Sequence, residues 1–178
     1  TSLTNIIIPD SVTTIEEGTF YNCESLKDVT IGNQVTWIGD EAFYSCDSLT
    51  SITIPNSVTT IGESAFGFCD NLKEFKGKFA SEDARCLIVD GVLNSFAPAG
   101  LTEYTIPGSV TTIGDCAFLC CSNLSSVTIP NSVTTIGEMA FASLFPDNSN
   151  LKTIVIPDSV TSIGSWAFLL CDNLTSVT

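Results

Sequence analysis

The sequence predicts a β-rich solenoid, because one string of residues recurs along most of the 178-residue chain. An isoleucine opens each copy, and most copies follow the preceding one by 23 residues; these isoleucines are Ile8, Ile31, Ile54, Ile106, Ile129 and Ile156. Apolar residues fall at fixed offsets within a copy, yet neither a strand period nor a helix period runs through the whole set. Each copy must therefore contain several short segments, whose apolar side chains are buried only when neighbouring copies stack.

The segments of one coil follow from residue types in the most regular copy. Leu49–Ile54 is β-branched and partly alternating, which predicts a strand, and Pro55 ends it because proline has no N–H to donate. Val58–Ile61 is a second short extended segment. We expect a positive-φ corner at Gly62 and about one turn of helix at Glu63–Phe66, with the acid at the favourable amino-terminal end.

The repeat as a whole reads L-x-x-I-x-I-P-x-S-V-T-x-I-G-x-x-A-F-x-x-C. It contains the L-x-x-L-x-L strand pattern of leucine-rich repeats, and it resembles the BspA-like leucine-rich repeat family of bacterial and protist surface proteins. The resemblance covers nearly the whole chain. It implies a right-handed leucine-rich-repeat solenoid, and a secreted or cell-surface, adhesin-like protein that binds host or microbial macromolecules.

We expect a single solenoid domain over residues 1–178, with about seven to eight coils. Residues 77–105 depart from the repeat. There, Cys86–Val89 and Val92–Phe96 flank Asp90-Gly91, which predicts a hairpin inside one irregular coil. The first and last residues fall within a copy, so the chain reads as a fragment of a longer array.

The charge balance disfavours two classes of partner. The chain has 6 basic and 20 acidic residues, and its net charge is −14. Nucleic-acid binding requires a basic surface, and anionic membranes repel an acidic one. No apolar run approaches the roughly 20 residues of a membrane-spanning helix, so we expect no membrane insertion in this segment.

Five of the eight cysteines share one offset, three residues after the repeated phenylalanine: Cys23, Cys46, Cys69, Cys121 and Cys171. A recurring inward position favours a column of buried thiols, because free cysteine packs as a small hydrophobe. Stacking also brings neighbouring thiols close together, so disulfides between coils stay an open alternative. The chain has no histidine and no C-x-x-C pair, which disfavours zinc. We expect no cofactor.

The acids form a second column, consisting of Glu17, Asp40, Glu63, Asp115 and Glu138. A ladder of carboxylates could hold Ca²⁺. An acid at the start of a short helix explains the same residue type without a metal, and we favour this interpretation. Catalysis is also disfavoured, because there is no histidine for a triad. A catalytic carboxylate pair should stand apart from the repeat, and only Glu74 and Glu103 approach that condition.

Strand side chains that point away from the core should line a concave binding face. The candidate partner-binding residues are Asp28, Thr30, Ser51, Thr53, Glu74, Lys76, Glu103 and Thr105. Together with the resemblance, they indicate a non-catalytic binding module displayed at the cell surface. Its expected partner is a protein or glycan, for example in the extracellular matrix. The alternative is a structural spacer that displays another domain. The apolar ends of the array also predict end-to-end self-association.

Overall fold

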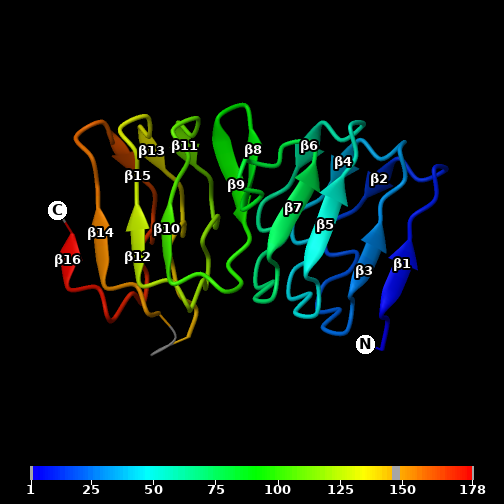
Figure 1. Ribbon diagram of the computed structural model, residues 1–178, viewed down its shortest axis with the longest axis horizontal. Helices are drawn as coiled ribbons and strands as arrows, with labels where there is room; N and C mark the ends of the chain where they lie inside the picture. Colours follow the sequence, from blue (N-terminus) through cyan, green and yellow to red (C-terminus); the bar gives the residue numbers. More distant parts are fainter. Residues whose placement is uncertain (1, 146–148, 178) are drawn as a thin grey trace.

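Two ladders of short parallel strands run along the chain and define its coils. The computed structural model describes residues 2–145 and 149–177, and Figure 1 shows an elongated stack with the termini at opposite ends. The predicted β-rich solenoid is confirmed. Over the described residues there is no α-helix, and accordingly none that could cross a membrane.

Each regular coil contains a first strand and a second strand. The first strands are β1 (Asn5–Ile7), β3 (Asp28–Thr30), β5 (Ser51–Ile54), β7 (Glu74–Gly77), β10 (Glu103–Thr105), β12 (Ser126–Thr128), β14 (Thr153–Val155) and β16 (Ser176–Val177). The second strands are β2 (Thr14–Ile15), β4 (Trp37–Ile38), β6 (Thr60–Ile61), β11 (Thr112–Ile113), β13 (Thr135–Ile136) and β15 (Ser162–Ile163). A hairpin of β8 (Cys86–Val89) and β9 (Val92–Phe96) interrupts the series.

Residues that lie opposite each other in neighbouring strands are one repeat length apart in the sequence. Asn5 lies opposite Asp28 in a parallel pair, 23 residues along the chain. Ser126 lies opposite Thr153 in the same way, across the one regular coil that is longer. Parallel strands stack at about 4.8 Å, so the sequence period becomes a coil of fixed thickness.

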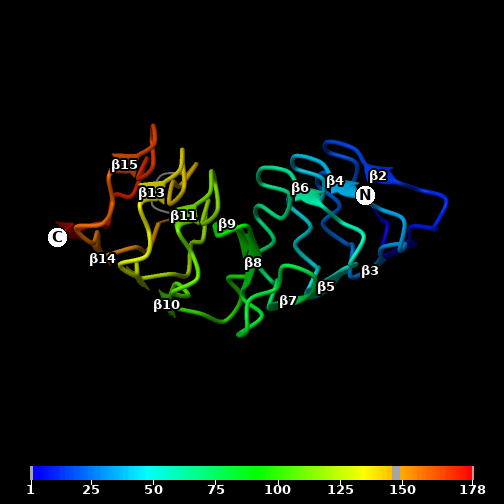
Figure 2. The same cartoon turned by 90° about the horizontal axis from the view of Figure 1, so that it is seen from above.

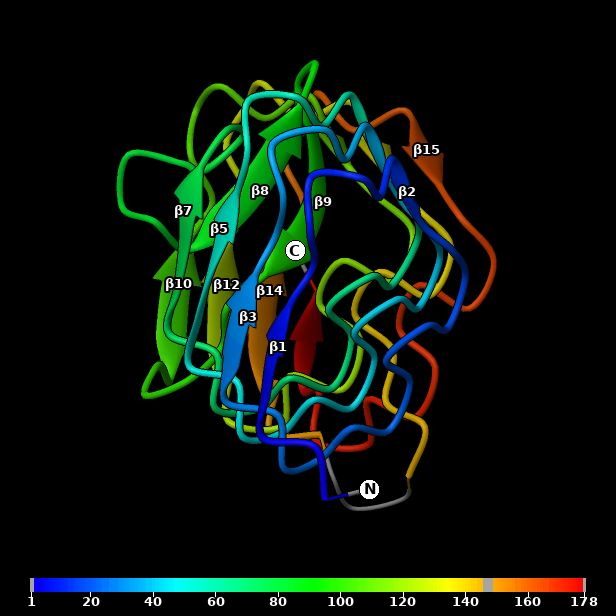
Figure 3. The same ribbon diagram turned by 90° about the vertical axis from the view of Figure 1, so that its right-hand side faces the viewer.

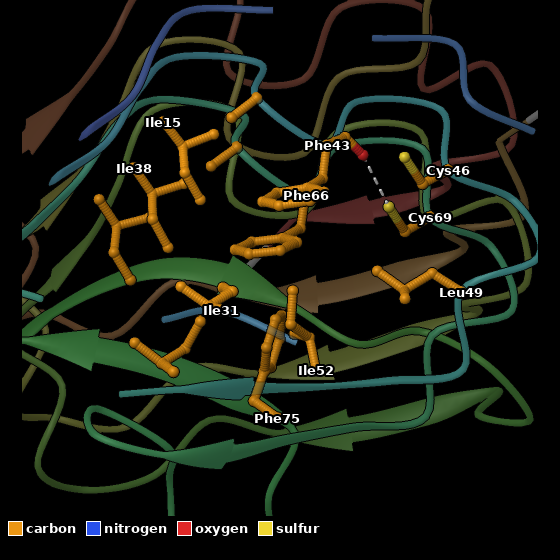
Figure 4. Close-up of a cluster of buried hydrophobic side chains, with 14 of the residues drawn as sticks. Ile15, Ile31, Ile38, Phe43, Cys46, Leu49, Ile52, Phe66, Cys69 and Phe75 are labelled. Atoms are coloured by element: carbon orange, nitrogen blue, oxygen red, sulfur yellow. Dashed lines mark hydrogen bonds between the residues drawn. The ribbon is translucent and has the colours of Figure 1, made fainter. Parts of the chain in front are cut away.

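The repeated phenylalanines stack along the axis of the solenoid, as Figure 4 shows for Phe43 and Phe66. Their ring centroids lie 5.3 Å apart with an interplanar angle of 2°, and Phe20 lies 5.1 Å from Phe43 on the other side. Phe118 and Phe141 form an equivalent stack at 5.0 Å in the carboxyl-terminal half. Phe43, Phe66, Phe118 and Phe141 are buried, which confirms the predicted inward offset.

The segment expected to be helical forms a ladder of tight turns. Ser64 has a φ of 50°, which lies in the left-handed region and interrupts a right-handed helix. Instead of bonding along a helix, the Glu41 N–H donates to the Glu63 carbonyl of the next coil at 2.9 Å. The expected helical turn at Glu63–Phe66 is therefore wrong, because these peptide groups pair with a neighbouring coil.

Gly62 is required by close packing between coils, and the expected positive φ is wrong. Its φ is not among the positive values of the chain. A Cβ at Gly62 would collide with the N and Oδ1 atoms of Asp40 in the preceding coil. The same Asp40 Oδ1 accepts a hydrogen bond from the Glu63 N–H at 2.9 Å. Gly137 has the same relation to Asp115.

The predicted hairpin in the irregular coil is confirmed. β8 and β9 are antiparallel, and Asp90 and Gly91 at the tip have φ values of 50° and 81°, as a type I′ turn requires. β9 pairs with β11 and so joins the second-strand ladder. In the irregular coil, β9 of the hairpin therefore takes the place of the second strand.

A polar network holds the loop that precedes the hairpin. Tyr104 Oη donates to Asp83 Oδ2 at 3.0 Å and lies 3.1 Å from Cys86 Sγ. Ser81 Oγ and the Arg85 N–H both donate to Asp83 Oδ1. Partial burial alone would raise the pKa of Asp83, but these hydrogen bonds outweigh it and lower that pKa below its ordinary value. The carboxylate thus ties the loop to β10.

The irregular coil has no equivalent of the tight turns, and this leaves a gap in one ladder. The turn at residues 64–68 would normally donate to the next turn, which here is residues 115–119. No backbone hydrogen bond joins these two described segments. A cavity of about 20 Å³ lies between them, lined in part by Ser95 and Phe96, which is room for about one water molecule.

The two halves of the stack meet at an angle at the irregular coil. In Figure 2 the first strands lie on the outer side of this bend and the second strands on its inner side. Seen end-on (Figure 3), the first strands form one wall, while the second strands and turns close the other sides. The expected concave shape of the first-strand face is therefore not found.

Gly62→Ala should lower the free energy of unfolding by about 1–3 kcal/mol, because the added Cβ forces two coils apart. Urea unfolding followed by circular dichroism measures this change. Gly108→Ala is the matched control, since a Cβ there meets no atom within 4 Å and its φ is ordinary; it should be neutral or slightly stabilising. Equal losses in the two variants would contradict the packing argument.

Candidate binding surface

Six of the eight candidate residues lie on one continuous surface formed by β3, β5 and β7. We call it the strand face and define it as Asp28, Thr30, Ser51, Thr53, Glu74 and Lys76. Ser51 lies opposite Glu74, and Thr53 opposite Lys76, in a parallel pair, and β3 contacts β5. Alternation along each strand buries the intervening residues, such as Ile52, and leaves these polar side chains exposed or partly exposed.

Glu74 and Lys76 form an ion pair on the strand face. Lys76 Nζ lies 2.6 Å from Glu74 Oε1, and the two side chains are 53% and 42% exposed respectively. Solvent screens such an exposed pair, which stabilises a fold by only about 0.2–1 kcal/mol. A partner can therefore replace either member of the pair at little energetic cost.

Glu103 and Thr105 lie on β10, apart from the strand face. β7 and β10 belong to different sheets, because the loop before the hairpin lies between them. On one side Ala84 O accepts a hydrogen bond from the Phe75 N–H at 2.7 Å, and on the other side Asp83 is bonded to β10. The structure therefore does not bring Glu103 together with the Glu74–Lys76 pair.

The cysteine column runs beside the phenylalanine stack, as Figure 4 shows for Cys46 and Cys69. Three thiols of the column donate to the phenylalanine carbonyl of the preceding coil: Cys69 to Phe43 at 3.2 Å, Cys46 to Phe20 at 3.4 Å and Cys171 to Phe141 at 3.2 Å. All eight cysteines are free in the structure. Burial raises the pKa of the Cys46 thiol to about 12, so this thiol stays protonated near neutral pH. The column is buried at Cys23, Cys46 and Cys69 and partly exposed at Cys121 and Cys171.

Bonds between coils explain two of the five acids in the acidic column, Asp40 and Asp115, since the helix invoked for the column does not form. Asp40 and Asp115 each accept a hydrogen bond from the N–H of the acid one coil later, at 2.9 Å from Glu63 and 2.6 Å from Glu138. Desolvation, followed by repulsion from Asp115 and Asp40, raises the pKa of Glu63. Within the described ranges, no group of three or more acids or cysteines is placed to hold a metal ion.

A polar hollow at the edge of the strand face contains residues that the sequence analysis missed. It measures about 470 Å³ and is lined by Lys27, Asp28, Ser48, Thr50, Asn71 and Lys73; we call it the lysine hollow. Only Asp28 was a candidate, because most of the other lining residues precede the strands. A signal existed in the sequence, where Lys27 and Lys73 share one offset two coils apart in a chain with 6 basic residues.

A row of aromatic rings on the turn side was also missed. Tyr21 and Tyr44 stack with centroids 5.0 Å apart, and Phe68 lies 5.0 Å from Tyr44. Gly67 makes room for this arrangement, because a Cβ there would lie 2.9 Å from the Tyr44 ring. The row is partly exposed, and Tyr44 and Phe68 also pack against a small cluster of Leu119, Cys120 and Ala142 in the carboxyl-terminal half.

Comparison with known proteins identifies the repeat. Residues 1–82 and 93–178 match the model described as BspA type leucine rich repeat region, in six copies. The chain belongs to the BspA-type leucine-rich repeat family. The unmatched residues 83–92 contain β8 and the hairpin tip, so the irregular coil is where this chain departs from the BspA-type pattern. No curated protein shows significant similarity to it.

Several solved bacterial proteins share this BspA-type fold. A leucine-rich cell surface protein of Faecalibacterium prausnitzii is 30% identical, with a TM-score of 0.78 over 98% of this chain and 53% of its own. The pneumococcal vaccine antigen PcpA is 24% identical, with a TM-score of 0.80 over 99% and 50% of the two chains. The leucine-rich repeat protein TpLRR of T. pallidum is 25% identical, with a TM-score of 0.58 over 99% and 80%. The chain spans about half the length of the first two proteins.

The buried thiols predict a loss of stability at alkaline pH. Folding raises the pKa of Cys46 from 9.0 to about 12, so above about pH 9 the unfolded chain releases a proton that the folded chain keeps. The free energy of unfolding should therefore fall as pH rises from about 9 to about 12. Urea titrations across this range measure the slope. Cys46→Ala should show a shallower slope than the unmodified chain, and identical slopes would contradict the assignment.

Proposed function

We propose that this BspA-type solenoid is a non-catalytic binding module, secreted or displayed at the cell surface, that recognises a protein or glycan through its strand face. The observation that carries the proposal is the strand face itself, where rigidly paired strands hold exposed polar side chains in a fixed array. The description of the F. prausnitzii relative as a cell surface protein supports the location.

The distribution of charge favours a binding module over a structural spacer. Charged residues at outward first-strand positions occur on β3, β7 and β10, whereas the equivalent positions Ser126, Thr128 and Thr153 are uncharged. A spacer has no need of such differences in charge between equivalent positions of its coils. A binding surface is expected to concentrate its irregular, partner-specific residues in one area.

The arrangement of carboxylates supports a non-catalytic role. Acid–base hydrolysis needs two carboxyl groups facing one substrate. Glu74 is paired with Lys76, and Glu103 lies on a separate sheet beyond the intervening loop. These two acids, which come closest to standing outside the repeat, are not arranged as a facing pair.

Ligand binding should depend on residues of the strand face and not on the equivalent residues of β12 and β14 in the carboxyl-terminal half. The folded chain is applied to a panel of purified extracellular-matrix proteins and glycans, and bound ligands are titrated. The double variant Glu74→Ala/Lys76→Ala should weaken binding about tenfold, as expected for loss of two charge-assisted contacts. The matched control is Ser126→Ala/Thr153→Ala, at the equivalent positions of β12 and β14.

Glu103→Ala, made separately, reports whether the ligand extends across the irregular coil onto β10. No ligand in the whole panel would favour the spacer. Unchanged binding by Glu74→Ala/Lys76→Ala would remove the strand face from the proposal.

We also propose that two copies of this solenoid associate end to end through the amino-terminal coil of one copy. An apolar hollow of about 210 Å³ opens there, lined among others by Ile6, Ile8, Val12 and Phe20. Sedimentation should show self-association that grows with protein concentration, and Val12→Lys should reduce it because a buried charge is costly. A monomer at all concentrations would contradict this proposal.

A further inference from the structure

We propose that the lysine hollow binds anionic carbohydrate, meaning a sugar chain that carries carboxylate or sulfate groups. The inference rests on the proposed function, because Asp28 belongs to both the strand face and the hollow, and it specifies a ligand class and an anchoring site. The hollow lies where the chain enters β3, β5 and β7, and it is lined entirely by polar or charged residues.

The backbone ladder holds the two lysines of the hollow in register. The Lys73 N–H donates to Thr50 O at 2.9 Å, and the Lys27 N–H donates to Thr4 O at 2.8 Å. Lys27, Thr50 and Lys73 therefore occupy the same position in three successive coils. Two coils separate the lysine backbones by about 10 Å, so the lysines suit two anionic groups along a chain better than a single anion.

Both ammonium groups are available to a ligand. The ion pair found among the described residues joins Glu74 to Lys76, so neither Lys27 nor Lys73 lies within 4.0 Å of the carboxylate of a described residue. Both lysines are exposed. In a chain with a net charge of −14, two unpaired cations beside one hollow form a local site that the surrounding surface does not offer.

The remaining lining groups match sugar hydroxyls. The hydroxyl groups of Ser48 and Thr50 make no hydrogen bond to a described residue. At the offset of Thr50, by contrast, the Ser125 and Thr175 hydroxyls are bonded to carbonyls of the preceding coil. Asn71 donates its amide to Asp47 O at 2.8 Å, which fixes the side chain at the rim. No apolar side chain lines the hollow, which disfavours a peptide anchored by hydrophobic residues.

The acidic surroundings determine how binding should respond to salt. The lysine pair attracts an anionic chain, but solvent ions screen exposed charges beyond about 10 Å at 0.1 M salt. Affinity for an anionic sugar chain should therefore fall with added salt. A neutral sugar chain would not show this dependence.

The test measures binding of the folded chain to three immobilised polysaccharides: polygalacturonate, dextran sulfate and unmodified dextran. Polygalacturonate and dextran sulfate distinguish carboxylate from sulfate as the preferred group, and unmodified dextran measures the contribution of the sugar alone. Poly-glutamate serves as an anionic chain without sugar. We expect binding to at least one of the two anionic polysaccharides, little to dextran, and weaker binding to poly-glutamate.

Lys27→Ala/Lys73→Ala should weaken that binding about tenfold or more, as loss of two charge-assisted contacts predicts. Lys27→Arg/Lys73→Arg should retain it. The matched control is Lys152→Ala, because Lys152 shares the offset but lies outside the lysine hollow; binding by this variant should be unchanged. All these residues are exposed, so circular dichroism should show unaltered folding.

The proposal is overturned if neither anionic polysaccharide binds, if dextran binds equally well, or if the double alanine variant binds like the unmodified chain. Equal or tighter binding of poly-glutamate overturns the carbohydrate assignment. These outcomes leave the proposed function standing as long as a ligand from the matrix and glycan panel depends on Glu74 and Lys76. If no panel ligand depends on Glu74 and Lys76 while anionic polysaccharide still binds through Lys27 and Lys73, the strand face is rejected as a binding surface and the lysine hollow stands as a binding site.

Discussion

Backbone pairing between neighbouring coils is the constraint on which the rest of this structure depends. Every regular coil has to present its N–H and C=O groups to the neighbouring regular coil at strand spacing, both on its strands and in its tight turns. Side chains have to fit that spacing. Phe43 satisfies it by stacking flat between Phe20 and Phe66, and Gly62 satisfies it by having no side chain where the Asp40 backbone passes.

The sequence predicts the features that repeat, and it predicts less of the features that depend on pairing between coils. The phenylalanine and cysteine columns are visible as offsets because a buried position admits few residue types. The hairpin is predicted by Asp90-Gly91, whose backbone preference is local. The turn at Glu63–Phe66 looks helical in isolation, since nothing local shows that its N–H groups bond across to another coil.

The binding surface is the least predictable part, for a related reason. Outward strand positions follow from alternation, so the sequence predicts that Thr30 and Thr53 point away from the core. Whether β7 and β10 are neighbours depends on where the irregular coil places Asp83–Arg85, which local sequence does not determine. Lys27 and Lys73 were overlooked because they precede their strands, and only the three-dimensional stack shows that they border a common hollow with Asp28.

The gap in the turn ladder has a consequence for how the molecule responds to stress. Repeat arrays unfold according to the strength of each contact between neighbours, and here one contact lacks the pairing between turns 64–68 and 115–119. The main hydrophobic core divides near the same place, with Phe66 and Phe75 in one cluster and Phe96 and Phe118 in another. A smaller cluster, in which Tyr44 and Phe68 pack against Leu119, Cys120 and Ala142, spans the junction. The two halves should therefore open as separate cooperative units. Tension along the axis would concentrate at this junction, so that the solenoid yields there while its coils stay intact.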